Sequence, residues 1–368
     1  MISSRPLRIV HIDTGATWRG GQGQLVKLAR GLRQRGHCQI VVCREESELE
    51  ARIRADGFPS FTLPLHDPGH VYGIVQLRQL LRLAPCDLVH SHDGRGQTLA
   101  WLASMAMPVR RVASRRVAFL PKYRWTYRLK YGSTCDAVIA VSDYIRQRAI
   151  DCGVPPSKIE LIPDGIEIPP QLPTRELRAQ ARARWGFGER ELLMGHLGAF
   201  TPEKGQDVAL HALELLKERL PEARLLLAGE GPSLKSPEIL QAREAVEDRV
   251  RFCGAVRDVS EFFCALDLFV MPSKSEGLGS SVLMAMSFGL PVVASRVGGL
   301  SELVVDGCTG SLVEPASPLA LAQAIAAAAS QRARLQQWGL NARERARQFS
   351  VDIMVGRTEA LYSRLLSG

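Results

Sequence analysis

The sequence has 368 residues, of which 46% are hydrophobic and 23% are charged, and its formal net charge is +9. This composition excludes an intrinsically disordered chain, and the length suits two domains of about 150–200 residues each. No apolar run approaches the roughly 18–20 residues that a membrane span needs. The first residues, MISSRPLRIVHID, are too short and strand-like for a secretory signal. We therefore expect a soluble, cytoplasmic protein.

The positive charge is confined to the first half of the chain. Residues 1–170 hold 24 Lys and Arg against 15 Asp and Glu, whereas residues 171–368 hold 23 of each. Between Asp93 and Asp136 nine basic residues occur and no acidic one. This asymmetry predicts an anionic partner for the first half.

Strand and helix patterns alternate in the first half. A helical pattern, with Leu25, Leu28 and Leu32 on one face, follows the first strand, and two more run over 73–84 and 96–106. Such alternation predicts a parallel sheet with helices on both faces. The strand patterns occupy 7–13, 39–43, 58–65, 87–92, 110–114, 137–142 and 158–163.

The stretch from Asp164 to Arg190 is rich in proline and then in arginine, which predicts a domain boundary. A second alternation follows it, with strands at 192–198, 224–231, 250–256, 267–273, 291–295 and 310–315. We expect two Rossmann-like domains, residues 1–170 and 171–345, and a final segment, 346–368. Its helix, capped by Ser350, is expected to dock on the first domain through Ile353, Leu361 and Leu365.

Polar loops follow several of the predicted strands. They contain the ranges 15–21, 90–93, 201–205 and 276–281. Ligands of open parallel sheets bind at the carboxyl ends of the strands, so these loops predict a ligand cleft between two facing domains.

The first of these loops, TGATWRGGQGQ, is not a GxGxxG motif, and no acidic residue ends the second strand, so a dinucleotide site is weakly supported. Gly20 and Gly21 fit a close approach of the backbone to a ligand. A flexible turn explains them equally well.

The stretch from Met271 to Gly299 has the order strand, glycine loop, helix and strand. Gly277, Gly279, Ser280 and Ser281 precede its apolar helix, whose first amides predict an anion site. Glu276 would repel a phosphate, but a carboxylate suits the hydroxyl groups of a sugar. The alternative is an ordinary surface glutamate in a connecting loop.

Two more side chains are candidates from their positions. Lys204, just before a helix, suits a diphosphate, although a lysine there is more commonly solvated. His92 suits a sugar hydroxyl, and the alternative is a histidine that ends a strand.

The combined pattern resembles a known family. The stretch PSKSEGLGSSVLMAMSFGLPVVASRVGGLSELVVDGCTG is similar to the nucleotide-sugar site of family 4 retaining glycosyltransferases (glycosyl transferases group 1). The motifs HSHD, VIAVSDYIR, LIPDGIE, LGAFTPEKGQD and LLLAGEGP match that family in order and spacing. The resemblance implies the GT-B fold, which has two Rossmann-like domains facing across a cleft and a C-terminal helix that crosses back to the first.

The resemblance also implies residue roles. Glu276 would bind hydroxyls of the donor sugar, Lys204 would bind the diphosphate, and His92 would lie near the anomeric carbon. We take these three as the catalytic residues. The other implied donor-binding residues are Gly20, Gly21, Gly198, Gly277, Leu278, Gly279, Ser280 and Ser281.

The sequence departs from the family pattern at two positions. Met284 stands where the second glutamate of the Glu-x7-Glu pair holds the ribose, and Ala199 stands where the family commonly has an arginine. Arg19 is a candidate replacement for that arginine. Both departures reduce the expected contacts to the nucleotide and leave the sugar end intact.

The family reaction transfers a sugar with retention from a nucleotide-sugar, which is a co-substrate. It needs no cofactor and no protein nucleophile, because the leaving phosphate can take the proton of the acceptor. No DxD-type pair ends a strand, and the eight cysteines form no CxxC pair and have no histidines at ligand spacing. We therefore expect no metal site.

The basic, aromatic-rich segment RRVASRRVAFLPKYRWTYRLKY lies in the domain that receives the acceptor in this family. We expect it to meet an anionic glycan or lipid-linked acceptor, such as a phosphorylated lipopolysaccharide core, at the inner face of the plasma membrane. A solvated arginine face and a nucleic-acid surface are alternatives, and no nucleic-acid motif supports the latter. A non-catalytic GT-B protein that binds a glycan or a partner also stays open. The residues expected at this surface are Arg115, Arg116, Lys122, Arg124 and Arg128.

Overall fold

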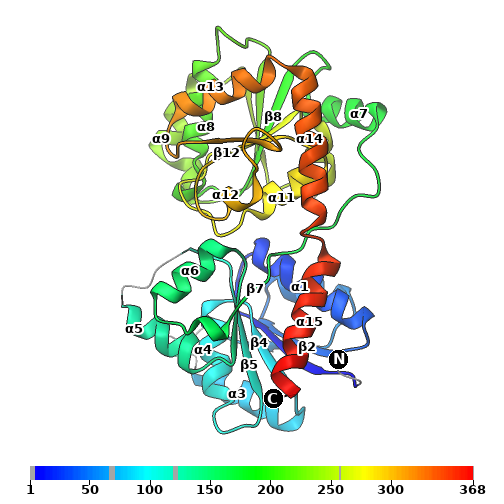
Figure 1. The fold of residues 1–368 in the computed structure, drawn as a ribbon, viewed down its shortest axis with the longest axis vertical. Helices are drawn as coiled ribbons and strands as arrows, with labels where there is room; N and C mark the ends of the chain where they lie inside the picture. The colour runs from blue at the N-terminus through cyan, green and yellow to red at the C-terminus, as the bar shows by residue number, and fades with distance from the viewer. Residues whose placement is uncertain (1–4, 66–70, 119–122, 257, 368) are drawn as a thin grey trace. The chain divides into compact units, whose positions relative to one another are not determined.

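The computed structural model describes residues 5–65, 71–118, 123–256 and 258–367, so Lys122 lies outside the described residues. The chain forms two compact units. Unit 1 is Met1–Gly165 with Val351–Gly368, and unit 2 is Ile166–Ser350. Each unit contains one parallel sheet with helices packed on its faces (Figure 1).

Unit 1 has a seven-stranded sheet in the order β3-β2-β1-β4-β5-β6-β7. All six pairings are parallel, and His11 in β1 pairs with His90 in β4. The strands are β1 (Arg8–Asp13), β2 (Cys38–Arg44), β3 (Ser60–Leu63), β4 (Leu88–Ser91), β5 (Arg110–Arg115), β6 (Ala137–Ala140) and β7 (Ile159–Leu161).

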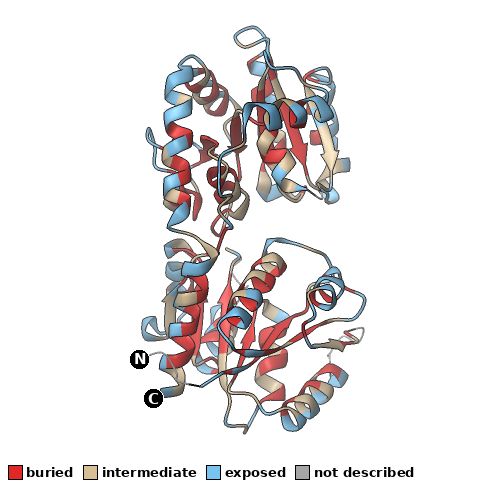
Figure 2. Cartoon of the chain, turned by 90° about the vertical axis from the view of Figure 1, so that its right-hand side faces the viewer, coloured by how far each residue is buried: buried red, intermediate tan, exposed pale blue. Residues whose placement is uncertain are grey.

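Successive residues of these strands point to opposite faces of the sheet, so each face has its own core. Ile9 and Leu88 pack with α1 and α15, whereas Val10 and Val89 pack with α3 and α4. Figure 2 shows the buried strands between helices whose outer sides are exposed. The helices of unit 1 are α1 (Gly20–Gln34), α2 (Glu48–Ala55), α3 (Val71–Leu83), α4 (Gly94–Ala103), α5 (Arg124–Tyr127), the π-helix η1 (Arg128–Ser133), α6 (Asp143–Asp151), the 3₁₀ turn η2 (Pro156–Lys158) and α15 (Val351–Ser367).

The terminal helix α15 packs on unit 1, as expected, and two of the three residues expected at the contact lie there. Leu361 is buried and Leu365 packs against the core, whereas Ile353 is 37% exposed. The expectation for Ile353 was wrong because the buried stripe of α15 runs through Met354 and Val355, one and two positions later. Helix α14 ends at Arg347 within unit 2, and the chain enters unit 1 again at Val351.

Buried polar contacts also hold α15. Glu359 accepts hydrogen bonds from His37 Nε2 at 2.9 Å and from Arg35 Nη1 at 2.7 Å. His37 Nδ1 accepts from the backbone N–H of Leu7 at 3.1 Å, so the proton of the neutral ring lies on Nε2. Burial raises the pKa of Glu359, but the bonds from His37 and Arg35 outweigh it and hold that pKa below its usual range.

Unit 2 has a six-stranded parallel sheet in the order β10-β9-β8-β11-β12-β13. Its strands are β8 (Leu192–Leu197), β9 (Ala223–Ala228), β10 (Val250–Gly254), β11 (Leu268–Met271), β12 (Val292–Ser295) and β13 (Gly310–Val313). Its helices are α7 (Arg175–Trp185), α8 (Gln206–Leu215), α9 (Pro237–Glu244), α10 (Val259–Ala265), α11 (Ser280–Ser287), α12 (Leu300–Leu303), α13 (Pro318–Ala329) and α14 (Arg332–Arg347), with 3₁₀ turns η3 (Pro202–Lys204) and η4 (Pro232–Lys235).

The predicted fold class, two parallel Rossmann-like sheets with a returning C-terminal helix, is confirmed. Every predicted strand is present. Among the described residues, no helix is long and apolar enough to cross a membrane.

Candidate functional site

Both sheets have one topological switch point, where the strand order reverses. In unit 1 it lies between β1 and β4, and in unit 2 between β8 and β11. Ligands of such sheets bind at the carboxyl ends of the two strands that flank the switch point. The four polar stretches singled out by the sequence lie at the carboxyl ends of β1, β4, β8 and β11, and the second of them includes His90 and Ser91, the last two residues of β4. The predicted site residues therefore gather at one edge of each sheet, in each unit separately.

In unit 2 the switch point brings Lys204 and Glu276 together. Lys204 Nζ donates to Glu276 Oε2 at 2.6 Å, and Ser273 Oγ lies 3.4 Å from the same oxygen. The side chains of Lys204 and Glu276 are 21% and 13% exposed, so the pair is partly shielded from water and still reachable. Residues 72 positions apart thus place a cation beside a carboxylate at the end of the sheet.

Glycine makes this approach of the two loops possible. Gly205 has φ +69°, and a Cβ there would collide with the backbone carbonyl of Pro272. Lys274 N donates to Glu203 O at 2.7 Å, which joins the loops a second time. A side chain at position 205 would therefore force the Lys204 loop away from the Glu276 loop.

Helix α11 begins beside Glu276. Its N-cap, Gly279, has φ +106° and supplies no side chain, so among the described residues no side-chain cap binds the first amides of α11. Ser280 and Ser281, the first two helical residues, are only half-buried. Leu278 is buried and lies against Gly299, where a Cβ would overlap its backbone. This start of a helix can accept an anion through backbone N–H groups.

A buried histidine, His196 in β8, lies next to Gly198. His196 Nδ1 lies 3.1 Å from the Val270 carbonyl, which has no proton, so Nδ1–H is the donor and Nε2 carries a lone pair. That Nε2 is buried, has no partner in the described part of the chain, and is 3.4 Å from the position of a Cβ on Gly198. Burial lowers the pKa of His196 to about 4, so the ring is neutral at pH 7.

The two departures from the family pattern lie at the same edge. Met284 is half-buried and is the fifth residue of α11, about one turn from the start of that helix. The Ala199 carbonyl accepts from Gln206 Nε2 at 2.9 Å, so this residue serves to fix the loop. Neither side chain can replace a charged ligand.

In unit 1, buried carboxylates arrange the loop after β1. Asp13 accepts from Gln22 Nε2 at 2.7 Å and from the Gly15 N–H at 2.9 Å. Burial, and secondarily the charge of Asp93, raises the pKa of Asp13. Gly20 and Gly21 are the first two residues of α1 and not loop residues as expected, because the chain turns into the helix directly at Arg19.

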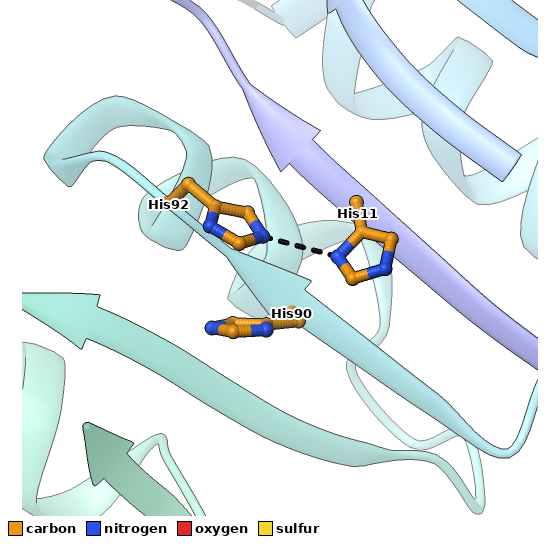
Figure 3. A group of neighbouring side chains, drawn as sticks. All are labelled: His11, His90 and His92. Carbon is orange, nitrogen blue, oxygen red and sulfur yellow. Dashed lines mark hydrogen bonds between the residues drawn. The ribbon is translucent and has the colours of Figure 1, made fainter. Parts of the chain in front are cut away.

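His92 lies at the end of a buried relay of hydrogen bonds. Gln39 Nε2 donates to the Ala29 carbonyl at 2.9 Å, which directs its Oε1 to His11 Nε2 at 3.0 Å. His11 Nε2 therefore carries the proton, and His11 Nδ1 accepts from His92 Nε2 at 3.0 Å (Figure 3). Arg116 Nη1 lies 3.4 Å from the remaining nitrogen, His92 Nδ1. Both ring nitrogens of His92 are thus engaged within unit 1.

Imidazole is a common metal ligand, and nitrogen atoms of His11, His90 and His92 lie within 4.8 Å of one another. The geometry does not suit a metal ion. The His90 and His92 rings are tilted by 34°, with their centroids 4.1 Å apart (Figure 3). Both nitrogens of each of the three rings already lie at hydrogen-bond distance from side chains of unit 1. His90 nitrogens contact Tyr362 Oη at 2.5 Å and Ser114 Oγ at 2.8 Å.

Burial is the main reason why these three histidines are neutral. It lowers the pKa of His11 to about 4 and those of His90 and His92 well below 6.5. The charge of Arg116 acts in the same direction on His90 and His92. The trio is accordingly a neutral hydrogen-bonding cluster at pH 7.

The expected acceptor-binding arginines fall into two groups. Arg115 is 8% exposed, and Arg116, with a side chain 13% exposed, pairs with Asp164 at 2.8 Å. Arg124 and Arg128 are exposed, as are the nearby Tyr123, Trp125 and Leu129. Lys122 lies outside the described residues.

Four residues at these sites have no role assigned from the sequence: His11, Gln39, Asp164 and His196. A histidine inside a buried strand is a signal for His11 and His196, and Asp164 lies in the motif LIPDGIE. The partners of Gln39 and Asp164 are 28 and 48 residues away, so no local pattern indicates their contacts.

Comparison with known proteins agrees with this arrangement. The model of glycosyl transferases group 1 matches residues 178–345, and that of glycosyltransferase family 4 matches residues 18–168. A GDP-mannose-dependent alpha-(1-6)-phosphatidylinositol monomannoside mannosyltransferase of Mycolicibacterium smegmatis is 32% identical over 253 residues, 62% of this chain and 65% of that protein. A D-inositol 3-phosphate glycosyltransferase of Streptomyces avermitilis is 29% identical over 84% of this chain and 72% of its own length. The match thus spans less than two thirds of the mannosyltransferase.

Solved structures share the fold. Anabaena Alr3699/HepE in complex with UDP-glucose has a TM-score of 0.87 at 22% identity, covering 96% of this chain and 99% of that one. WaaG, a glycosyltransferase involved in lipopolysaccharide biosynthesis, has a TM-score of 0.73 at 20% identity, with coverage of 96% and 99%. The chain belongs to the family 4 glycosyltransferases, the glycosyl transferases group 1, and has the GT-B fold.

Proposed function

We propose that this protein is a retaining glycosyltransferase that moves a sugar from a nucleotide-sugar to an anionic glycan or lipid-linked acceptor. Bacterial cell-surface polysaccharide or lipopolysaccharide synthesis is the setting that we favour. The names of two relatives support a phosphate-bearing acceptor, phosphatidylinositol monomannoside in one and D-inositol 3-phosphate in the other. WaaG, which is involved in lipopolysaccharide biosynthesis, has the same fold, and this likeness supports the proposed setting by analogy.

The pairing of Lys204 with Glu276 at the switch point of unit 2 carries the proposal. A donor needs a cation for its diphosphate and acceptors of hydrogen bonds for its sugar hydroxyls. Lys204 and Glu276 supply both, 2.6 Å apart, beside the uncapped start of α11. The backbone from Gly277 to Ser281, together with Gly198, would line the phosphates.

In the proposed reaction the bond between the anomeric carbon and the diphosphate breaks first, and the acceptor hydroxyl attacks from the same face. Lys204 and the first amides of α11 stabilise the negative charge that develops on the leaving diphosphate. The leaving phosphate takes the proton of the acceptor hydroxyl, so no protein base is needed. Glu276 holds the sugar in place, and the His11–His92 bond fixes the position of the chain at His92.

Unit 1 would bind the acceptor. Arg124 and Arg128 are exposed beside Tyr123, Trp125 and Leu129, so charge and apolar surface occur together on one short segment. Anionic lipid attracts such a segment by about 1 kcal/mol per basic residue, and aromatic side chains favour the membrane interface. This combination supports a cytoplasmic protein in peripheral contact with the inner face of the plasma membrane.

The alternative, a non-catalytic GT-B protein that binds a glycan or a partner, is favoured by Ala199 and Met284, which remove two nucleotide contacts of the family pattern. Incubation with radiolabelled UDP-, GDP-, ADP- and CMP-sugars and a phosphorylated glycan acceptor separates the two. We expect transfer from one donor with an α- or β-linkage that matches the donor. Donor binding without transfer or hydrolysis for any of the four would favour the alternative.

A further inference from the structure

Arg115 is a buried cation with no carboxylate partner among the described residues. It ends strand β5 and is 8% exposed. Its guanidinium donates from Nε to Tyr127 Oη and from Nη1 to Tyr131 Oη, both at 3.2 Å, and from Nη2 to the Val117 carbonyl at 3.4 Å. A buried positive charge is costly unless an anion compensates it. Neutral hydroxyl groups supply only part of that compensation. Among the described residues, two of the five N–H groups of the Arg115 guanidinium have no hydrogen-bond partner.

A second cation lies in the same place. The side chain of Lys130 is half-buried, and within the described ranges Nζ makes no hydrogen bond or ion pair, only a contact 5.8 Å from the Tyr131 ring centroid. Burial, and then the charge of Arg115, lowers the pKa of Lys130. Tyr131 Oη and Lys130 Nζ both lie beside Gly94, 3.7 and 3.8 Å from the position that a Cβ would take there.

The carboxylates near this cluster are already engaged. Asp93 accepts from Thr14 Oγ1 at 2.5 Å and from the amides of Arg95 and Gly96, the first turn of α4. Asp164 pairs with Arg116. The N-terminus of α4 therefore offers no free amide at residues 95 and 96. An anion beside Arg115 and Lys130 would have to be bound by side chains.

We propose that Arg115, Lys130 and the hydroxyl of Tyr131 form a binding site for one phosphate group, a phosphomonoester or phosphodiester of the acceptor. This rests on the proposed function, because it assigns a substrate group to the acceptor-binding unit. Two cations that lie against one tyrosine, together with its hydroxyl, match the charge and the acceptor oxygens of a phosphate. Tyr127 holds the guanidinium from the other side and is a positioning residue.

The site is distinct from the expected membrane surface. Arg124 and Arg128 are exposed on the same segment, with Trp125 67% exposed, whereas Arg115 is enclosed. A flat lipid surface reaches the exposed group and not the enclosed one. A phosphate on a soluble acceptor and a phosphate within a lipid headgroup therefore share the chemistry but differ in their dependence on the exposed arginines.

The first measurement is calorimetric titration of the full chain with inorganic phosphate. All variants in this titration also carry Lys204→Gln, so that phosphate does not bind at the donor site of unit 2. We expect Lys130→Gln to weaken the phosphate Kd at least tenfold and Tyr131→Phe to weaken it severalfold. The matched control Arg146→Gln, which replaces an exposed arginine of α6, should leave it unchanged. Lys130 Nζ makes no hydrogen bond or ion pair within the described part of the chain, so Lys130→Gln should fold and remain informative if Arg115→Lys unfolds the protein.

The second measurement distinguishes the source of the phosphate. Vesicles of phosphatidylcholine with phosphatidylglycerol should bind less of the Arg124→Gln variant and as much of the Lys130→Gln variant as of the parent. Glycerol 3-phosphate in solution should bind more weakly to the Lys130→Gln variant and as tightly to the Arg124→Gln variant as to the parent. The proposal is overturned if inorganic phosphate does not bind, if Lys130→Gln and Tyr131→Phe leave its Kd unchanged, or if Lys130→Gln lowers vesicle binding instead. Each result is independent of whether a nucleotide-sugar binds to unit 2.

Discussion

Lys204 Nζ and Glu276 Oε2 are 2.6 Å apart, although the residues belong to the loops after two different strands, β8 and β11. The cation that would bind the diphosphate and the carboxylate that would bind the sugar thus neutralise each other. A bound nucleotide-sugar has to separate the two side chains, so that Lys204 contacts the diphosphate and Glu276 contacts the sugar. That requirement makes the pair selective for a ligand with an anionic and a hydroxylated part.

Replacing Lys204 by alanine should remove charge stabilisation at the leaving group. We expect kcat to fall about 10²- to 10³-fold, the effect of losing one oxyanion-hole donor. Lys274 provides a matched control, because it lies in the same loop as Glu276 and pairs with Asp207, in the first turn of α8, at 2.9 Å. Steady-state kinetics of Lys204→Ala and Lys274→Gln should give a large loss only in the first. Equal rates in the two variants would remove Lys204 from the mechanism.

Glu276→Gln should affect the sugar and the diphosphate in opposite directions. The variant loses the acceptor of the sugar hydroxyls, so the Kd of the nucleotide-sugar should rise about tenfold, roughly 1.4 kcal/mol. It also frees Lys204 from its ion pair, so the free nucleoside diphosphate should bind as tightly as before or more tightly. Calorimetric titration with both ligands tests this. A parallel loss for both would mean that Glu276 supports the loop and does not read the sugar.

Met284→Glu should restore the second carboxylate of the family pattern. Met284 is half-buried on α11, so a glutamate can be accommodated with its carboxylate reaching solvent. If ribose contacts are what this chain lacks, the nucleoside diphosphate should bind up to about tenfold more tightly, roughly 1.4 kcal/mol. Met284→Leu, which changes the shape without adding charge, is the control. No gain over that control would show that the ribose is held elsewhere.

Four buried histidines should make the fold sensitive to mild acid. The pKa values of His11 and His196 are lowered to about 4, and those of His90 and His92 well below 6.5. Below pH 6.5 the unfolded chain binds protons that the folded chain does not, so the free energy of unfolding falls as the pH falls. Each such histidine contributes up to about 1.4 kcal/mol per pH unit between the two pKa values.

Urea unfolding at pH 7.0, 6.0 and 5.0 measures this loss, which should reach several kcal/mol by pH 5. Burial and the charge of Asp93 raise the pKa of Asp13, so protonation of this carboxylate stabilises the folded chain as the pH falls. This effect opposes that of the histidines, but it comes from one group against four. His211→Gln is the control, because His211 is exposed and should contribute little. A free energy of unfolding that is the same at pH 7.0 and 5.0 would contradict the neutral state of the cluster.

The sheets could be predicted from the sequence because buried parallel strands are short apolar runs with turn residues around them. The packing face of α15 could not be predicted fully. Ile353 and Met354 are both apolar, and only the position of the helix on unit 1 decides that Met354 is buried and Ile353 exposed.

The candidate site could be predicted only where its residues lie in local motifs. Lys204 and Glu276 each follow a strand, and the strand order then brings them together. The bond between His11 and His92 depends on the pairing of β1 with β4, which no local pattern encodes. Likewise, the sequence presents Arg115 and Arg124 as members of one basic segment. Their separation into a buried and an exposed group follows from the end of β5 at Arg115.

The most direct test of the account is a thermal-shift screen of the full chain with UDP-, GDP-, ADP- and CMP-linked sugars. A ligand at 100 times its Kd stabilises the folded chain by about 2.7 kcal/mol, which raises Tm by several degrees. We predict that at least one donor raises Tm in the unsubstituted chain and in Lys274→Gln, and that Lys204→Gln abolishes this shift. Failure of all four donors to raise Tm, or an equal shift in Lys204→Gln, would contradict a donor site at the Lys204–Glu276 pair.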